Sequence, residues 1–173
     1  MKKIALLIGI SEYFSDSFKN LPSTLKDVEA MKEVLDNSQM GDFDETKVLQ
    51  NSHRQEIELA IYELFADRNQ DDVLLLYFSG HGVLSRESNL LLATPITDKS
   101  ERDIIRPTAV AASFLQSEIN NSLSERLVVI LDCCYSSTFT KGMNVKGDKK
   151  IDIPPESLTI PPIVSVISNR FKV

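Results

Sequence analysis

Cys133 and Cys134 are the only cysteines among the 173 residues, and they stand side by side at the end of an apolar run, LVVILDCC. Adjacent thiols cannot link distant parts of a chain, which excludes a disulfide framework of the kind found in small secreted domains. They also lack the two-residue gap of common zinc ligands. A thiol that follows a buried strand is suited to act as a nucleophile, provided that a base lies near it.

A histidine at the end of another apolar run supplies a candidate base. His81 stands between Gly80 and Gly82, directly after LLLYFS. Flanking glycines let the backbone turn tightly and come close to a bound substrate. An imidazole there can take the thiol proton and later pass it to a leaving amine. His53 has no such context and is predicted to be a helix-start or surface residue. We therefore predict a nucleophilic pair of His81 with one of the two thiols.

The alternation of side chains along a strand separates the two cysteines. Leu131 and Cys133 fall on one face of the predicted strand, whereas Asp132 and Cys134 fall on the other. Cys133 is expected to be buried under helices, as free cysteines often are. Cys134 lies one step further out, where the strand opens into a loop. We expect Cys134 to be the reactive thiol.

The apolar runs alternate with segments of helical periodicity. Buried strands are predicted at 3–10, 46–51, 72–78 and 126–132, and helices at 24–38, 54–68 and 108–122, the last with Pro107 near its first turn. Apolar strands without polar alternation, joined by helices, predict a mostly parallel sheet covered on both faces. Ligands of such sheets bind beyond the carboxyl ends of the strands, which is where His81 and Cys134 follow two of them.

Composition excludes several other classes of protein. The chain has 19 basic and 25 acidic residues, a net charge of -6, and no dense basic cluster, so we expect no nucleic-acid partner. No run approaches the roughly 18 apolar residues of a membrane span. The apolar N-terminal run is too short for a signal peptide and is interpreted as the first core strand. At 42% hydrophobic residues, the chain can bury one core, and we expect a cytoplasmic protein without membrane association.

Three motifs resemble those of the caspase-like cysteine peptidases and are most similar to the bacterial orthocaspase and metacaspase branch. They are KKIALLIGISEY with LPSTLKDVEAMKEVL, then YFSGHG, then LDCCYSS. A histidine about 50 residues before the cysteine is also typical of caspases. The resemblance implies a caspase-like three-layer sandwich, an α/β fold with a mostly parallel sheet of four or five strands flanked by helices. Ser137 stands where the metacaspase pattern usually has glycine.

The resemblance also implies roles for individual residues. His81 and Cys134 would form a dyad without a third side chain, and the backbone N–H groups of Gly82 and Cys134 would form the oxyanion hole. Asp132 matches the acid by which metacaspases bind a basic residue at the cleaved position, and Asp27 resembles a second one. Two carboxylates favour a guanidinium or an ammonium group. The implied activity is a cysteine endopeptidase that cleaves protein or peptide substrates after Arg or Lys.

Many metacaspases bind calcium through acids that follow the histidine, and Asp98 resembles one such acid. Calcium needs six or more oxygen ligands, and the stretch where further ligands are expected, RPTAVAASF, contains no carboxylate. We therefore expect neither calcium dependence nor any other cofactor.

The composition changes near residue 140. We expect a caspase-like catalytic, large-subunit domain over 1–140, and a Lys/Gly-rich loop with a proline-rich tail over 141–173, where IVSVIS (163–168) would start a truncated small subunit. A short sheet exposes an unpaired edge, which predicts a small-subunit-like partner chain or a homo-oligomer. Two alternatives stay open: a catalytically impaired caspase-like regulatory or scaffold module that needs a partner, and a cysteine hydrolase acting on small acyl substrates.

Overall fold

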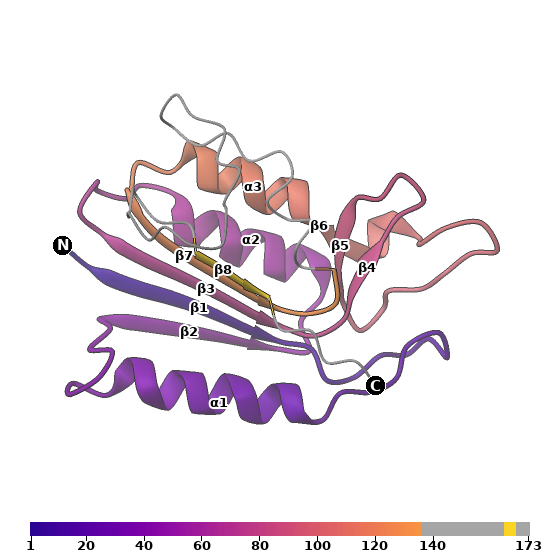
Figure 1. Ribbon diagram of the computed structural model, residues 1–173, viewed down its shortest axis with the longest axis horizontal. Coiled ribbons are helices and arrows are strands. Elements are labelled where there is room, and N and C mark those ends of the chain that lie inside the picture. Colours follow the sequence, from indigo (N-terminus) through magenta and orange to yellow (C-terminus); the bar gives the residue numbers. More distant parts are fainter. Residues whose placement is uncertain (136–164, 169–173) are drawn as a thin grey trace, which may run out of the picture.

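The computed structural model of the chain describes residues 1–135 and the strand at 165–168. Helix α1 lies against one face of the main sheet, and α2 and α3 lie against the other, which makes three layers (Figure 1). The elements of the main sheet and its helices are β1 (Lys3–Gly9), α1 (Ser23–Asp36), β2 (Glu45–Gln50), α2 (Arg54–Phe65), β3 (Val73–Ser79), α3 (Ala112–Asn121), β7 (Arg126–Asp132) and β8 (Ser165–Ser168).

The main sheet has five strands in the order β2-β1-β3-β7-β8, and every neighbouring pair is parallel. The strand predicted near 163–168 takes the place beside β7, where Val128 is paired with Ser165. The predicted α/β fold, with a parallel sheet of four or five strands flanked by helices, is confirmed.

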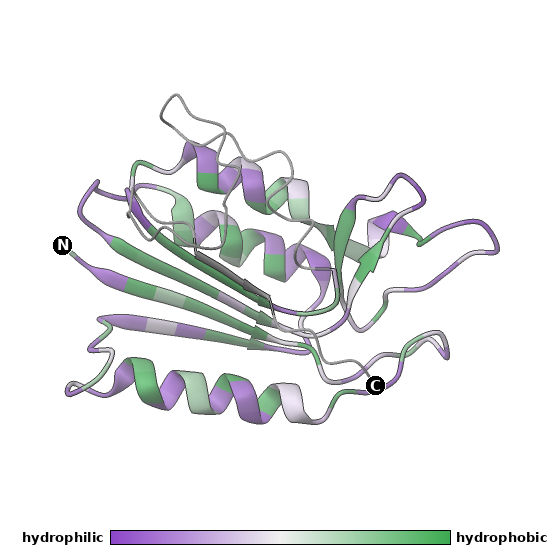
Figure 2. Ribbon diagram, viewed as in Figure 1, coloured by the Kyte–Doolittle hydropathy of each residue, from purple (hydrophilic) through white to green (hydrophobic). Residues whose placement is uncertain are grey.

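Burial on both faces explains why the sequences of β1 and β3 are almost continuously apolar. All residues after the first in each of these strands are buried, and both strands are largely green in Figure 2. Leu7 and Tyr77 face α1, where they pack with Val28, whereas Leu6 and Ile8 belong to the core beneath α2 and α3. Each fully buried Leu or Ile stabilises the fold by about 2 kcal/mol relative to an exposed position.

The sequence did not predict a second, antiparallel sheet of three short strands at the carboxyl end of the main one (Figure 1). Its strands are β4 (Gly82–Leu84), β5 (Leu90–Ala93) and β6 (Ala109–Ala111). All four residues of β5 are buried, so its periodicity does not distinguish a strand from a helix.

The third helix begins later than predicted. Pro107 lies in a separate 3₁₀ turn, Arg106–Thr108, and the next three residues form β6 before α3 starts at Ala112. Ala109 and Val110 pair with β5, which satisfies their backbone groups in a ladder instead of a helical turn. His53 directly precedes α2 and is exposed, as predicted.

Within the described residues, no helix combines the length and the apolar character that crossing a bilayer requires.

Candidate active site

The register between β3 and β7 brings His81 and Cys134 to the same edge of the sheet, at the carboxyl ends of the strands. β3 and β7 are neighbours, and their last paired residues are Ser79 and Asp132. The pairing extends one step further, because the Gly80 N–H donates to the carbonyl of Asp132 at 3.4 Å. His81 and Cys134 each follow two residues after that last pair, so they leave the sheet at the same level.

The segments that carry these residues touch. A Cβ on Gly82 would collide with the backbone carbonyl oxygen of Cys134 and would lie 2.9 Å from Sγ of Cys133. Only glycine leaves room for the chain after β7 at this point. The glycine after the histidine is therefore required by the close approach of the two strand ends.

The backbone N–H of Gly82 is not used in the ladder with β5. The Ala93 N–H donates to the carbonyl of His81 at 2.9 Å, so residues 81 and 93 stand at a hydrogen-bonded position of the antiparallel ladder, although only one of its two bonds is made. Bonded and non-bonded pairs alternate in such ladders, and Gly82 and Leu92 are the next pair. The Gly82 N–H consequently points away from β5.

The two cysteines have opposite environments, as the alternation predicted. Both are free thiols; Cys133 is buried in the core under α2 and α3, and Cys134 is exposed. Burial, followed by the negative charges of Cys134 and Asp132, raises the pKa of Cys133 to about 12. Cys133 is therefore protonated at neutral pH and inaccessible, which leaves Cys134 as the thiol able to react.

The loop after β1 holds the imidazole of His81. Nε2 lies 2.8 Å from the backbone carbonyl of Lys19, and since a carbonyl only accepts, Nε2–H is the donor. In the neutral ring, Nδ1 is then the unprotonated nitrogen. The backbone N–H of His81 donates to the hydroxyl of Tyr13 at 2.8 Å. No third side chain for the pair is predicted from the sequence; the structure supplies a main-chain carbonyl, which every residue type possesses.

The two predicted acids lie on the α1 side of the sheet, close enough for their negative charges to repel each other. Asp132 is half-buried at the end of β7, and Asp27 is exposed near the start of α1. Burial raises the pKa of Asp132, and the negative charge of Asp27 raises it further; the hydroxyl of Tyr77 opposes this rise. Burial also raises the pKa of Tyr77 to about 12, with the charges of both acids adding to the shift. Tyr77 was not anticipated, because it lies inside a strand.

Asp98 binds the loop after β1 and its own neighbour along the chain. Its side chain accepts a hydrogen bond from Ser15 Oγ and another from the backbone N–H of Lys99 at 2.8 Å. The Ser15 hydroxyl and the Lys99 N–H lower the pKa of the Asp98 carboxyl. Over residues 1–135, no three His, Cys, Asp or Glu side chains are grouped so that they could hold a metal ion. These described residues do not offer calcium its usual shell of six or more oxygen ligands.

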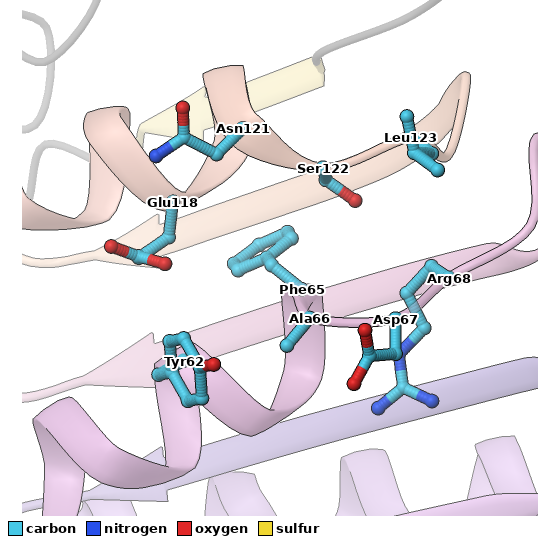
Figure 3. Close-up of a pocket in the computed structure, with 9 residues that line it drawn as sticks. All are labelled: Tyr62, Phe65, Ala66, Asp67, Arg68, Glu118, Asn121, Ser122 and Leu123. Carbon is cyan, nitrogen blue, oxygen red and sulfur yellow. The ribbon is translucent and has the colours of Figure 1, made fainter.

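A hollow of about 380 Å³ between the ends of α2 and α3 lies at the opposite edge of the sheet, where the strands begin (Figure 3). Tyr62 and Phe65 line it from α2, and Glu118 lines it from α3. The hollow is remote from His81 and Cys134 and contributes nothing to the candidate site.

Fold and site together define a class: a parallel α/β protein with a thiol and an imidazole at the carboxyl ends of neighbouring strands. Residues 2–168 match the family model described as the caspase domain. The chain belongs to this family of cysteine peptidases.

The fold also resembles the crystal structure of a protein from Geobacter sulfurreducens, with a TM-score of 0.55 and 18% sequence identity. The similarity covers 78% of this chain and 51% of that one, so this chain matches about half of that protein. At this identity the likeness concerns the fold alone. No curated protein matches the chain significantly.

Proposed function

We propose that the chain is a cysteine endopeptidase that cleaves after Arg or Lys by means of His81 and Cys134. One observation carries the proposal: the β3–β7 register brings the two residues to the same level at one edge, with Gly82 packed against Cys134. The metacaspase-like acids Asp132 and Asp27 support basic specificity over the acidic specificity of caspases.

In the acylation half, Nδ1 of His81 accepts the proton of the Cys134 thiol. The thiolate sulfur attacks the carbonyl carbon of the scissile peptide bond, and the N–H groups of Gly82 and Cys134 stabilise the negative charge that develops on its oxygen. The carbon–nitrogen bond then breaks, and the imidazolium gives its proton to the leaving amine. The Gly82 N–H suits this role because it points away from β5.

In the deacylation half, His81 accepts a proton from water, which attacks the thioester carbonyl carbon. The carbon–sulfur bond breaks, the sulfur of Cys134 recovers a proton from His81, and the product carries a new carboxylic acid. The hydrogen bond from Nε2 to Lys19 keeps Nδ1 available as the acceptor in both halves.

Specificity for a basic residue follows from the two acids. In the free protein, the pKa of Asp132 is raised by burial and by the charge of Asp27, so the site carries unfavourable negative charge. A guanidinium or ammonium group relieves that repulsion and forms charge-assisted hydrogen bonds, each contributing about 1.5–3 kcal/mol. An aspartate side chain would add to the repulsion.

A peptide panel tests the proposal. Peptides that differ only in Arg, Lys or Asp at the cleaved position are incubated with the wild-type chain, and the products are identified by mass spectrometry. We expect cleavage after Arg and Lys, none after Asp, and complete loss in Cys134→Ala. In Asp132→Asn, kcat/KM for the Arg peptide should fall about tenfold or more. Turnover of only the Asp peptide would refute the acid pocket, and unchanged activity of Cys134→Ala would refute the nucleophile.

An arginyl chloromethylketone separates the peptidase from the impaired regulatory module. A competent site alkylates the sulfur of Cys134, chloride departs, and the adduct is found by mass spectrometry. The reaction is run over a range of protein concentrations, because we also propose that a small-subunit-like partner or a second copy completes the enzyme. Failure to label Cys134 at every concentration would favour the regulatory module, and Cys134→Ala is the matched control.

A further inference from the structure

Tyr13 connects the loop after β1 to the backbone of His81. Its side chain is only 7% exposed, although it lies in a surface loop. The hydroxyl accepts a hydrogen bond from the His81 N–H at 2.8 Å and donates one to the carbonyl of Ile10 at 3.2 Å. Burial raises the pKa of this phenol above its usual value, so the hydroxyl stays protonated and can serve as donor and acceptor together.

The ring of Tyr13 also packs on the imidazole. The centroids of the Tyr13 and His81 rings are 4.7 Å apart, with the planes tilted by 56°. Phe18 completes the group, 5.6 Å from the ring of His81 and 5.7 Å from that of Tyr13. Two aromatic neighbours restrict rotation of the imidazole about its side-chain bonds.

The residue before the histidine shows that this contact is closely fitted. A Cβ on Gly80 would lie 3.0 Å from the Tyr13 hydroxyl and 3.0 Å from Cζ of Phe78. The glycines on either side of His81 thus have different uses: Gly82 makes room for the chain of Cys134, and Gly80 makes room for the phenol.

Tyr13 is itself held by the loop and its neighbours. Its backbone N–H donates to Oδ1 of Asn20 at 2.9 Å. Asn51 accepts from the N–H of Ser11 at 2.8 Å, and the N–H of Phe14 donates to the carbonyl of Pro95 at 2.9 Å. The phenol is therefore fixed from both sides, as a residue that positions another must be.

We propose that Tyr13 is a positioning residue for His81: its hydroxyl fixes the histidine backbone, and its ring holds the imidazole with Nε2 on Lys19 and Nδ1 free. The expected effect of Tyr13 on turnover rests on the proposed peptidase function, whereas its expected effect on the orientation of the imidazole does not. Without the hydroxyl, the ring samples other orientations and Nδ1 is available for only part of the time.

NMR signals of the ring nitrogens of His81 show directly which tautomer the imidazole adopts. The chain has two histidines, so ¹⁵N-labelled protein gives two sets of imidazole signals, and His53, exposed before α2, is the internal reference. Spectra are recorded well above the ordinary imidazole pKa of about 6.5. We expect wild-type His81 to show a single tautomer with the proton on Nε2. In Tyr13→Phe, its signals should move toward the tautomer mixture of His53. The matched control is Tyr62→Phe, a half-exposed tyrosine of α2, which should leave His81 unchanged.

Turnover gives the second readout. For the Arg peptide, kcat should fall about tenfold in Tyr13→Phe while KM changes less than about twofold, because the acids that bind the substrate are untouched. Gly80→Ala places a methyl group against the same hydroxyl and should shift the His81 signals in the same way. This variant tests the proposal if Tyr13→Phe does not fold.

The outcomes separate the two proposals. His81 signals identical to wild type in a folded Tyr13→Phe or Gly80→Ala protein would overturn the positioning role, whatever the peptidase assays give. Shifted signals in Tyr13→Phe, together with a wild-type chain that cleaves no peptide and is not labelled at Cys134 at any concentration, would uphold the positioning role and refute the peptidase.

Discussion

At the scale of single residues, two neighbouring thiols of identical chemistry acquire opposite properties from the alternation of β7. Cys133 points into the apolar core, where burial raises its pKa to about 12, whereas Cys134 lies exposed beside Gly82. Side-chain direction, rather than residue type, decides which sulfur can react.

Alkylation should distinguish the two sulfurs. Brief treatment of the native chain with iodoacetamide at neutral pH is expected to modify Cys134 and to spare Cys133, because a buried, protonated thiol is a poor nucleophile. Fragmentation of the LDCCYSS peptide in a mass spectrometer locates the label, and denatured protein, in which both sulfurs react, is the control. Labelling of Cys133 in the folded chain would contradict the burial that separates them.

The acid pair should make the binding of a basic side chain depend on pH. The pKa of Asp132 is raised by burial and then by the charge of Asp27, with Tyr77 opposing. In the free protein, ionised Asp132 is destabilising, so stability is lost as pH rises from the ordinary value of about 3.9 through the raised one. A bound cation needs the ionised form. We expect a reversible guanidinium inhibitor, whose binding needs no proton transfer by His81, to bind more weakly as pH falls through the raised pKa of Asp132. Asp132→Asn should remove this pH dependence of the inhibition constant, and a dependence that persists in Asp132→Asn would rule out the assignment.

At the scale of elements, the loop between β1 and α1 is braced by the segment after β5. Asp98 accepts from Ser15, Pro95 accepts from the Phe14 N–H, and the ammonium of Lys99 lies 5.0 Å from the centre of the Phe18 ring. Phe18 in turn packs on His81. An acid that the family resemblance offered as a calcium ligand thus takes part in holding the loop beneath the imidazole.

This brace should depend on pH. Hydrogen bonds from Ser15 and then from the Lys99 N–H lower the pKa of Asp98. Its contribution to stability is present above the unfolded-state value of about 3.9 and is lost as pH falls through the lowered value. We expect Ser15→Ala and Asp98→Ala to lower the melting temperature at neutral pH non-additively, because each removes the hydrogen bond between the two side chains. Additive effects in the double variant would show that the two side chains do not interact.

At the scale of the whole molecule, the five-stranded sheet places the two strands that lead to His81 and Cys134 in interior positions. β3 lies between β1 and β7, and β7 lies between β3 and β8. An edge strand exposes unpaired backbone groups and pairs readily with other chains. The short strand at 165–168 therefore protects the strand that ends at Asp132.

Removal of residues 165–173 should expose the edge of β7. We expect the melting temperature to fall by several degrees and the protein to associate, since an unpaired parallel strand invites pairing with another chain. Circular dichroism and sedimentation measure the two effects. The control is Ile167→Val in the full chain, which retains strand propensity and should behave as wild type. An unchanged melting temperature in the truncated chain would argue against a stabilising role for β8.

The sequence by itself determined the main sheet and the edge at which its chemistry gathers. The central strands are recognisable because burial on both faces makes them continuous apolar runs, and their parallel order follows from the helices between them. Once two such strands end at His81 and Cys134, both residues must reach the carboxyl edge. Alternation also predicted correctly that Cys133 would be the buried thiol.

Only the tertiary structure decided what surrounds His81 and Cys134. The carbonyl of Lys19 that receives Nε2–H belongs to a group present in every residue, so no pattern of residue types marks it. Tyr13 reaches His81, 68 positions further along the chain, because the loop folds back, and Asp27 acts on Asp132 because α1 packs on the sheet. The antiparallel strands were missed because strands of three or four residues are too short to show a period. Local patterns record which face of an element is buried, whereas contacts between loops depend on how the whole chain is packed.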